Sequence, residues 1–202
     1  LTNHALDFVG ANRDRPFFCY LPFNTPHAPM QVPDSFYRRF ANRELGMRHH
    51  GPQDEDMAMT RAALAMCENI DWNVGRVLAK LDELKIAGDT IVLYFSDNGP
   101  NSWRWNGGMK GRKGSVDEGG LRVPFLIRWP GHIRPRARIP QIAGATDLLP
   151  TLAAMAGVPL VSKKPLDGIS LQPLLEGQAG NWPDRMIFSL QGKRISVRTR
   201  QY

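Results

Sequence analysis

The sequence is poor in cysteine and contains no long apolar run. Two of its 202 residues are cysteine, and Cys19 and Cys67 form neither a CxxC pair nor the spacing of a zinc site. Each lies in an apolar or helical pattern, which indicates a buried, unreactive thiol. No apolar stretch approaches the roughly 18–20 residues that span a bilayer, and no basic-then-apolar leader is visible. We therefore expect no membrane span, whereas these features leave the cellular compartment open.

The composition excludes disordered and collagen-like chains. Hydrophobic residues make up 42% of the chain, close to the globular average, and the 19 glycines and 16 prolines follow no repeat. The length suits one ordinary domain or a large piece of a bigger protein, and it is sufficient to bury a core.

The positive charge is concentrated in one stretch. Residues 101–140 hold nine bases and two acids, whereas the rest of the chain balances at 17 of each, for a net charge of +7. Such a local excess indicates an anionic partner or substrate, or else a solvated surface loop. Nucleic acid is disfavoured, because the bases are not interleaved with stacking aromatic residues and no nucleic-acid motif occurs.

Apolar patterns predict helices that alternate with strands. The clearest is an amphipathic helix from about Glu55 to Lys85, with apolar residues every three or four positions. Unbroken apolar runs predict buried strands, and turn residues separate a closing hairpin. The other expected elements are strands at 17–21, 90–95 and 123–129, helices at 34–44, 146–157 and 169–177, and a hairpin of 185–190 with 194–200. This order predicts an α/β fold with a largely parallel sheet flanked by helices.

A carboxylate and an amide directly follow the strand expected at 90–95. In open α/β sheets, ligands bind outside the carboxyl ends of the strands, where Asp97 and Asn98 would lie. Their oxygens are ligands that Ca²⁺ or Mg²⁺ prefers, and Gly99 with Pro100 would force a turn that faces both to one site. An ordinary Asp-Asn-Gly turn is the alternative.

Two further segments carry groups suited to an oxyanion. In the segment from Lys110 to Gly120, glycines flank the cations and would let the backbone approach an anion closely. His27 follows the strand expected at 17–21 and lies between two prolines, so its imidazole could act as an acid, a base or a hydrogen-bond donor. A solvated loop and an incidental histidine are the alternatives.

Together these segments resemble the sulfatase family of the alkaline phosphatase superfamily. The resemblance covers most of residues 15–160, and its most specific parts are SDNG and the KGxxxEGGxRVPxxxxWPG pattern. The matching segments are PFFCYLPFNTPHAP, MCENIDWNVGRVLAKLDELKIAGDTIVLYFSDNGP, GRKGSVDEGGLRVPFLIRWPG and TDLLPTLAAMAG. It implies an alkaline-phosphatase-like α/β layer, with residues 1–180 as the later part of the α/β domain and 181–202 as the start of a small C-terminal β subdomain.

The resemblance also implies roles for individual residues. It assigns Ca²⁺ binding to Asp97 and Asn98, with Mg²⁺ as the alternative metal, and contact with the sulfate ester to His27 and Lys113, as catalytic and substrate-binding groups. Specificity within the family lies largely in loops. Our candidates for substrate contact are therefore Trp103, Arg104 and Trp105. The two tryptophan rings could stack on a sugar or else be buried within the loop.

Parts of the family pattern are absent from the sequence. The family uses a C/S-x-P-x-R segment whose Cys or Ser becomes a formylglycine nucleophile, and no such segment occurs in residues 1–202. Two metal-binding aspartates, a lysine and a histidine are also missing. The chain thus resembles the later portion of a sulfatase with about half of the active site, and we expect no turnover by residues 1–202 alone.

The expected function is hydrolysis of a sulfate monoester at a calcium site. A phosphodiesterase or phosphonate hydrolase of the same superfamily is one alternative, and a non-catalytic chain that binds anions or calcium is another. The expected partner is the sulfate ester substrate, with no nucleic acid. The family resemblance suggests a periplasmic, secreted or lysosomal protein. The natural ester and the oligomeric state remain open.

Overall fold

The structure is a computed structural model that describes residues 1–46, 54–178, 180 and 182–201. The chain forms two compact units, Leu1–Ile127 and Arg128–Tyr202. Among the described residues, no helix is both long enough and apolar enough to cross a membrane.

The first unit is organised around one long helix, α3, Met57–Glu83. The carboxylate of Asp56 caps its first turn by accepting a hydrogen bond from the Met59 N–H at 2.9 Å. Ala62, Met66, Ile70 and Leu81 are buried at helical spacing along one face, which confirms the helix expected from the sequence, although Met59 on the same pattern is exposed. The buried residues of α3 are Thr60, Ala62, Ala63, Ala65, Met66, Ile70 and Leu81.

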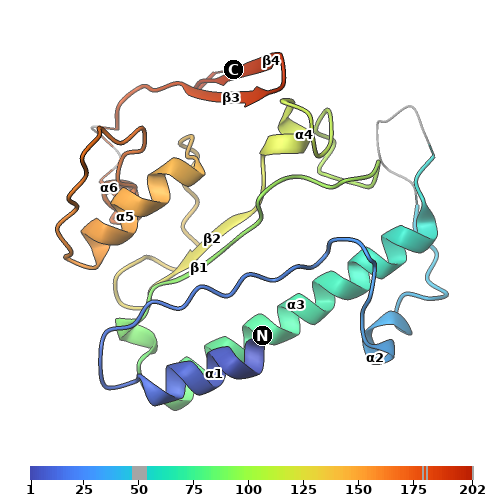
Figure 1. Cartoon of the computed structure of the whole chain (residues 1–202), viewed down its shortest axis with the longest axis horizontal. Helices are drawn as coiled ribbons and strands as arrows, with labels where there is room; N and C mark the ends of the chain where they lie inside the picture. Colours follow the sequence, from blue (N-terminus) through green and yellow to red (C-terminus); the bar gives the residue numbers. More distant parts are fainter. Residues whose placement is uncertain (47–53, 179, 181, 202) are drawn as a thin grey trace. The chain divides into compact units, whose positions relative to one another are not determined.

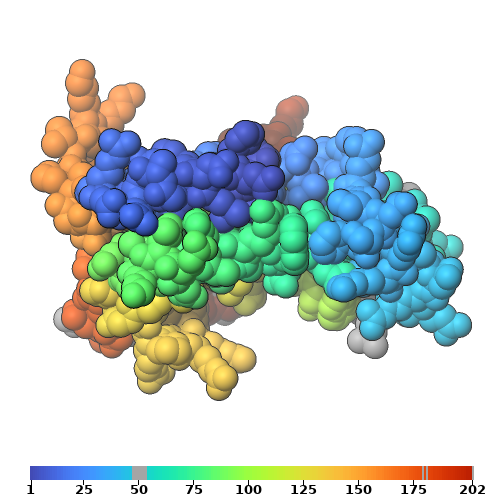
Figure 2. All heavy atoms as spheres, turned by 90° about the horizontal axis from the view of Figure 1, so that it is seen from below, coloured from blue at the N-terminus to red at the C-terminus, as the bar shows by residue number. Residues whose placement is uncertain are grey.

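Two N-terminal helices pack on α3. Helix α1, Thr2–Ala11, was not expected; it buries Ala5 and Val9 and lies along α3 (Figures 1 and 2). Helix α2, Asp34–Tyr37, also contacts α3 and is shorter than the helix expected over 34–44. No side chain caps the N-terminus of α1, whereas at its C-terminus the Asn12 side-chain N–H donates to the Phe8 carbonyl oxygen at 2.7 Å. Packing against α3 further stabilises this helix.

Strands β1, Val92–Phe95, and β2, Phe125–Arg128, are neighbours in a two-stranded sheet and confirm two expected strands. A 3-10 turn, Ala87–Asp89, leads into β1, and a short helix, α4, Glu118–Leu121, precedes β2. The other described strands form a separate pair, so the largely parallel sheet remains a prediction.

The buried strand expected at 17–21 is wrong for this structure. These residues belong to no sheet among the described residues, and the side chains of Phe18 and Tyr20 are exposed. A run of apolar residues becomes a strand only where a neighbouring strand pairs with its backbone, and the described chain places none there. The expectation of buried cysteines is also wrong, since Cys19 and Cys67 are both exposed. Cys67 directly follows the buried Met66 in α3. Consecutive residues of a helix point in different directions around its axis, so the Cys67 side chain lies outside the buried face.

The second unit joins two helices to a hairpin. Helices α5, Leu148–Met155, and α6, Gln172–Leu175, contact each other and fall within the expected helical segments. Strands β3, Ile187–Gln191, and β4, Arg194–Arg198, pair antiparallel and confirm the expected hairpin. Gly192 in its turn has φ of 61°, a conformation that favours glycine.

The core of the second unit contains a buried carboxylate. Asp147 precedes α5 and has no exposed surface. It accepts hydrogen bonds from the backbone N–H groups of Gly144 and Ile169 at 2.9 Å each, and Arg185 binds both its oxygens. The Asp147 side chain thus joins its own segment to the segments of Ile169 and Arg185. Thr151 of α5 also donates to the Asp147 backbone carbonyl oxygen at 2.6 Å.

Candidate functional site

The turn after β1 presents a carboxylate and an amide, as the sequence predicts. Asp97 is exposed, and Asn98 is half-buried. The Asn98 side-chain N–H donates to the Gly99 carbonyl oxygen at 2.9 Å, and the Ser96 hydroxyl donates to the Asn98 carbonyl oxygen at 3.2 Å. Asp97 makes no hydrogen bond or ion pair with the described residues, so its carboxylate is available to an external ligand.

Backbone hydrogen bonds attach this turn to the glycine-rich loop 110–120. The Gly99 N–H donates to the Gly120 carbonyl oxygen at 3.0 Å, and the Lys113 N–H donates to the Pro100 carbonyl oxygen at 2.8 Å. A Cβ at Gly99 would overlap the Gly119 carbonyl group, so the close approach requires glycine. The loop that carries Lys113 is therefore fixed to the turn that carries Asp97.

Asn106 holds the glycine-rich loop in shape, a role that the sequence analysis missed. Its side-chain amide donates to the carbonyl oxygens of Met109 at 3.0 Å and Gly111 at 3.1 Å. The Gly119 N–H also donates to the Lys110 carbonyl oxygen at 2.7 Å. The neighbouring pair of glycines after Asn106 was the available signal, because an asparagine before glycines is typical of a tight turn.

Lys113 differs from the other two cations of this loop. Lys110 forms an ion pair with Asp117 at 3.2 Å. Arg112 donates to the Asn101 carbonyl oxygen at 3.0 Å and lies 5.1 Å from the centre of the Trp103 ring. The half-buried Lys113 has no side-chain partner among the described residues. Its ammonium group is therefore the cation of this loop that is left to bind an external anion.

Two of the three residues expected to contact the substrate line a cavity of about 330 Å³. Trp103 and Arg104 line it together with Asn106, Gly108, Met109, Lys110, Gly111 and Asp117. Trp105 is 54% exposed and does not belong to this lining. The rim combines one aromatic ring with cations, a carboxylate and an amide, which suits a ligand with both an apolar face and polar groups.

Arg104 also interacts electrostatically with the start of α3. Desolvation lowers the pKa of its guanidinium, and Glu55, Cys67 and Asp56 act in the opposite direction. Its Nε is buried without a hydrogen-bond partner among the described residues. Arg104 is therefore held partly inside the unit, which limits its reach toward a ligand in the cavity.

His27 is exposed, and its Nδ1 lies 2.8 Å from the Ala28 carbonyl oxygen. The Thr25–Pro26 and Ala28–Pro29 peptide bonds on either side are cis. No described hydrogen bond or ion pair links His27 to Asp97, Asn98 or Lys113. The structure thus joins the Lys113 loop to the turn after β1, while the convergence of His27 on them remains a prediction.

The described residues offer some, but not all, of the ligands that a calcium ion needs. They contain no group of three or more His, Cys, Asp or Glu side chains that could hold a metal ion. Asp97 and Asn98 offer oxygen donors of the kind Ca²⁺ takes, but Ca²⁺ binds about six to eight oxygens. These two residues therefore fit a calcium site only as part of a larger ligand set.

Comparison with known proteins identifies the family of this chain. The Sulfatase family model matches residues 1–158. Steryl-sulfatase from Rattus norvegicus is 36% identical over 93% of this chain and 31% of the relative, and human arylsulfatase A is 36% identical over 92% of this chain and 33% of the relative. A crystal structure of Ps i-CgsB in complex with k-i-k-neocarrahexaose has a TM-score of 0.81 and 29% identity, covering 98% of this chain and 43% of that one.

The match extends over nearly all of this chain but only part of each relative. The chain spans about a third of the length of the two curated relatives. The segments that match include the turn with Asp97 and Asn98 and the loop with Lys113. By its sequence and its fold, this chain belongs to the sulfatase family.

Proposed function

We propose that this chain is part of a sulfuric ester hydrolase. It would contribute to the active site a metal-binding turn, which carries Asp97 and Asn98 after β1, and a sulfate-binding cation, Lys113. The observation that carries the proposal is the attachment of the Lys113 loop to the turn after β1 by the Lys113–Pro100 and Gly99–Gly120 hydrogen bonds. This attachment fixes the loop of Lys113, a cation with no described partner, to the turn of Asp97, a carboxylate with no described partner. Such an arrangement suits a sulfate group that contacts the lysine cation with one oxygen and a metal ion with another.

In this proposal each residue has one task. Asp97 and Asn98 hold Ca²⁺, or Mg²⁺ as the alternative, and the bound ion would polarise a sulfate oxygen. Lys113 neutralises charge that develops on the sulfate oxygens as the S–O bond breaks. His27 protonates, or donates a hydrogen bond to, the oxygen of the leaving group. The nucleophile comes from a segment other than residues 1–202, since these contain no C/S-x-P-x-R sequence.

The cavity beside the Lys113 loop supports a polar organic group on the substrate. Trp103 and Arg104 line this cavity with Lys110 and Asp117, and an exposed Trp105 lies next in sequence. A sugar ring presents apolar C–H faces to an aromatic ring and hydroxyls to charged side chains. The neocarrahexaose bound by the related structure agrees with this choice. A steroid would require a more apolar lining.

The proposal also includes the unconfirmed parts of the fold. We place β1 and β2 in a largely parallel sheet that other parts of the protein complete. Residues 1–180 then form the later part of the α/β domain, and residues 181–202 begin a small β subdomain. The exposed apolar side chain of Phe125 in β2 supports this placement, because further parts of the protein would cover it.

A substrate panel tests the proposed reaction. The full natural protein that contains residues 1–202 is assayed with Ca²⁺ against an aryl sulfate, an aryl phosphonate and a phosphodiester of the same aryl alcohol. Preferential release of the aryl alcohol from the sulfate is expected. Preference for either phosphorus ester would support the alternative reaction, and no turnover of any ester would support a non-catalytic binding chain. Residues 1–202 alone should release no aryl alcohol.

A further inference from the structure

The net positive charge of the protein resides in the second unit. Residues 128–202 contain 11 bases and four acids, whereas residues 1–127 contain 15 of each. One of the four acids, Asp147, is fully buried and bound to Arg185. The exposed surface of the second unit is therefore strongly basic, which favours a polyanionic ligand.

Three arginines of this unit lie together on one exposed turn. Arg134, Arg136 and Arg138 alternate with Pro135 and Ala137, and all three are exposed. None of the three makes an ion pair or side-chain hydrogen bond with the described residues. The Ala137 N–H donates to the Arg134 carbonyl oxygen at 3.3 Å, and Arg136 has φ of 58°. This is a left-handed conformation, which glycine adopts more easily than arginine.

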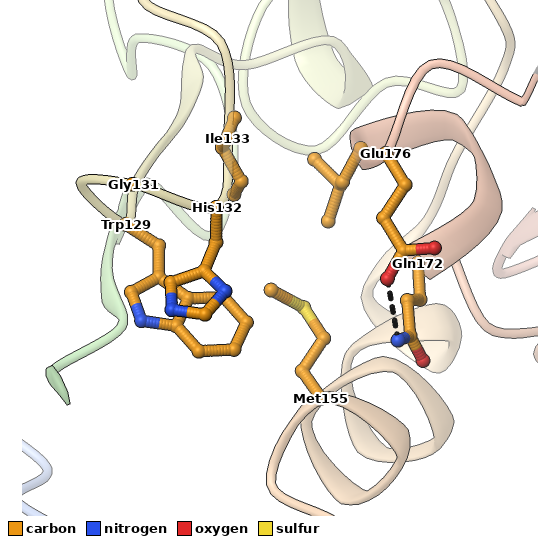
Figure 3. A pocket seen from close by; sticks show the side chains of 8 residues that line it. Trp129, Gly131, His132, Ile133, Met155, Gln172 and Glu176 are labelled. Carbon is orange, nitrogen blue, oxygen red and sulfur yellow. Dashed lines mark hydrogen bonds between the residues drawn. The ribbon is translucent and has the colours of Figure 1, made fainter. Parts of the chain in front are cut away.

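A cavity of about 380 Å³ is built from the turn immediately before these arginines. The rings of Trp129 and His132 stack with centres 3.8 Å apart and an angle of 17°, and Ile133 completes this wall. Figure 3 shows this stack facing Met155, with Gln172 and Glu176 on the opposite side. The Gln172 side-chain N–H donates to a Glu176 carboxylate oxygen at 2.7 Å.

The chemistry of this cavity suits one sugar ring. The exposed face of His132, backed by Trp129, and the thioether of Met155 offer apolar contacts to C–H groups. The Gln172–Glu176 pair offers amide and carboxylate groups to hydroxyls. The volume lies near the lower end of the range for small-molecule sites. Because Arg134 directly follows Ile133, a ligand longer than one sugar would continue toward the arginine turn.

We propose that the second unit binds a sulfated carbohydrate polymer, with one sugar ring in the Trp129–His132 cavity and sulfate groups on Arg134, Arg136 and Arg138. The class of polymer rests on the proposed function, whereas the site rests on the residues of the second unit. Guanidinium groups bind sulfate oxygens in pairs of hydrogen bonds, and exposed arginines without partners lose no internal ion pair on binding.

Binding of labelled dextran sulfate to the full natural protein tests this site. Replacing the three arginines with glutamine (R134Q/R136Q/R138Q) should weaken binding by about tenfold. Each exposed ion pair contributes roughly a factor of two or slightly more to affinity, and the variant removes three of them. The control variant K163Q/K164Q/R194Q removes the same charge from exposed positions elsewhere in this unit and should weaken binding by about twofold at most. His132→Ala should weaken it by about threefold.

Each outcome of the polymer test decides for or against the site. Unchanged binding by R134Q/R136Q/R138Q, or an equal loss in the control variant, would overturn the proposal. So would equally tight binding of unsulfated dextran, or of a DNA oligonucleotide of matched charge. Aryl sulfate turnover by the same samples separates the two proposals. Polymer binding at the arginine turn without any turnover contradicts the proposed function alone, and turnover that persists with no arginine-dependent binding contradicts this site alone.

Discussion

The backbone N–H of Lys113 donates to the carbonyl oxygen of Pro100 across 2.8 Å. Pro100 closes the turn that begins at Ser96 and carries Asp97, so this hydrogen bond makes the position of the Lys113 loop depend on the turn after β1. The Gly99–Gly120 hydrogen bond, at 3.0 Å, strengthens the same attachment. Changes that separate the two loops should therefore affect stability and function together.

Gly99→Ala should separate these loops. The added methyl group would overlap the Gly119 carbonyl group, and such overpacking lowers the free energy of unfolding by about 1–3 kcal/mol. Urea denaturation of the full natural protein measures this loss. The control Gly75→Ala lies in α3 with no atom within 4 Å of the new methyl group and should raise stability by up to about 1 kcal/mol. Equal stability of Gly99→Ala and the native protein would show that the loops do not need this close approach.

Calcium should stabilise the full natural protein through Asp97. A ligand present at about 100 times its dissociation constant stabilises the folded state by about 2.7 kcal/mol, and this appears as a rise in Tm that EDTA reverses. Asp97→Asn removes a charged oxygen donor and should abolish most of the rise. Asp89→Asn, an exposed aspartate before β1, is the matched control. A full calcium-dependent rise in the Asp97→Asn protein would exclude Asp97 as a ligand.

Asp147 should be essential to the stability of the second unit. It is fully buried, and Arg185 donates to its two oxygens at 2.9 and 3.0 Å. Asp147→Ala would leave the largely buried guanidinium unpaired, at a cost of about 3–5 kcal/mol in the free energy of unfolding. Chemical denaturation compares this variant with Asp167→Ala, which removes an exposed carboxylate of the same unit. Similar stability of the two variants would refute the role of the buried pair.

Cys67 should react slowly with alkylating agents. Although part of the residue is exposed, partial burial of the thiol desolvates it and raises its pKa, and the Arg104 guanidinium opposes this effect. Because the thiolate is the nucleophile, a raised pKa lowers the rate at a given pH and moves the rise in rate to higher pH. In a Cys19→Ala background, alkylation of the native protein should be slower than that of the urea-unfolded protein across pH 7–9.

Arg104 provides the second part of the thiol test. Arg104→Gln removes the cation that lowers the pKa of Cys67, so the alkylation rate should fall further at each pH. Arg61→Gln, on the same helix as Cys67, is the control. A faster reaction of Cys67 in the Arg104→Gln protein would contradict the assigned direction of this interaction.

The sequence predicts those elements whose pattern is complete within a short window. Helix α3 shows many turns of apolar spacing, and the β3–β4 hairpin has alternating strands around Gly192. The strand before Asp97 and Asn98 ends in a turn that glycine and proline mark. For this reason the sequence placed both residues correctly after β1.

Other features depend on contacts between distant segments, which a single sequence does not encode visibly. No side chain caps the N-terminus of helix α1, so the start of this helix is recognised only by its packing on α3. The apolar run 17–21 has no pairing strand among the described residues, and Phe18, Cys19 and Tyr20 within it are exposed. The Asp147–Arg185 pair joins positions 38 residues apart. The Lys113–Pro100 hydrogen bond likewise requires both loops to be folded.

The most direct test of the proposed sulfate site is the turnover of an aryl sulfate, with Ca²⁺ present, by the full natural protein and by its Lys113→Ala variant. Loss of a preorganised charge donor at the sulfate should lower kcat/KM by on the order of 100-fold or more, whereas Lys163→Ala, an exposed lysine of the second unit, should leave it unchanged. A Lys113→Ala protein that hydrolyses the aryl sulfate as fast as the native protein would contradict the assignment of Lys113, and with it the proposed sulfate site.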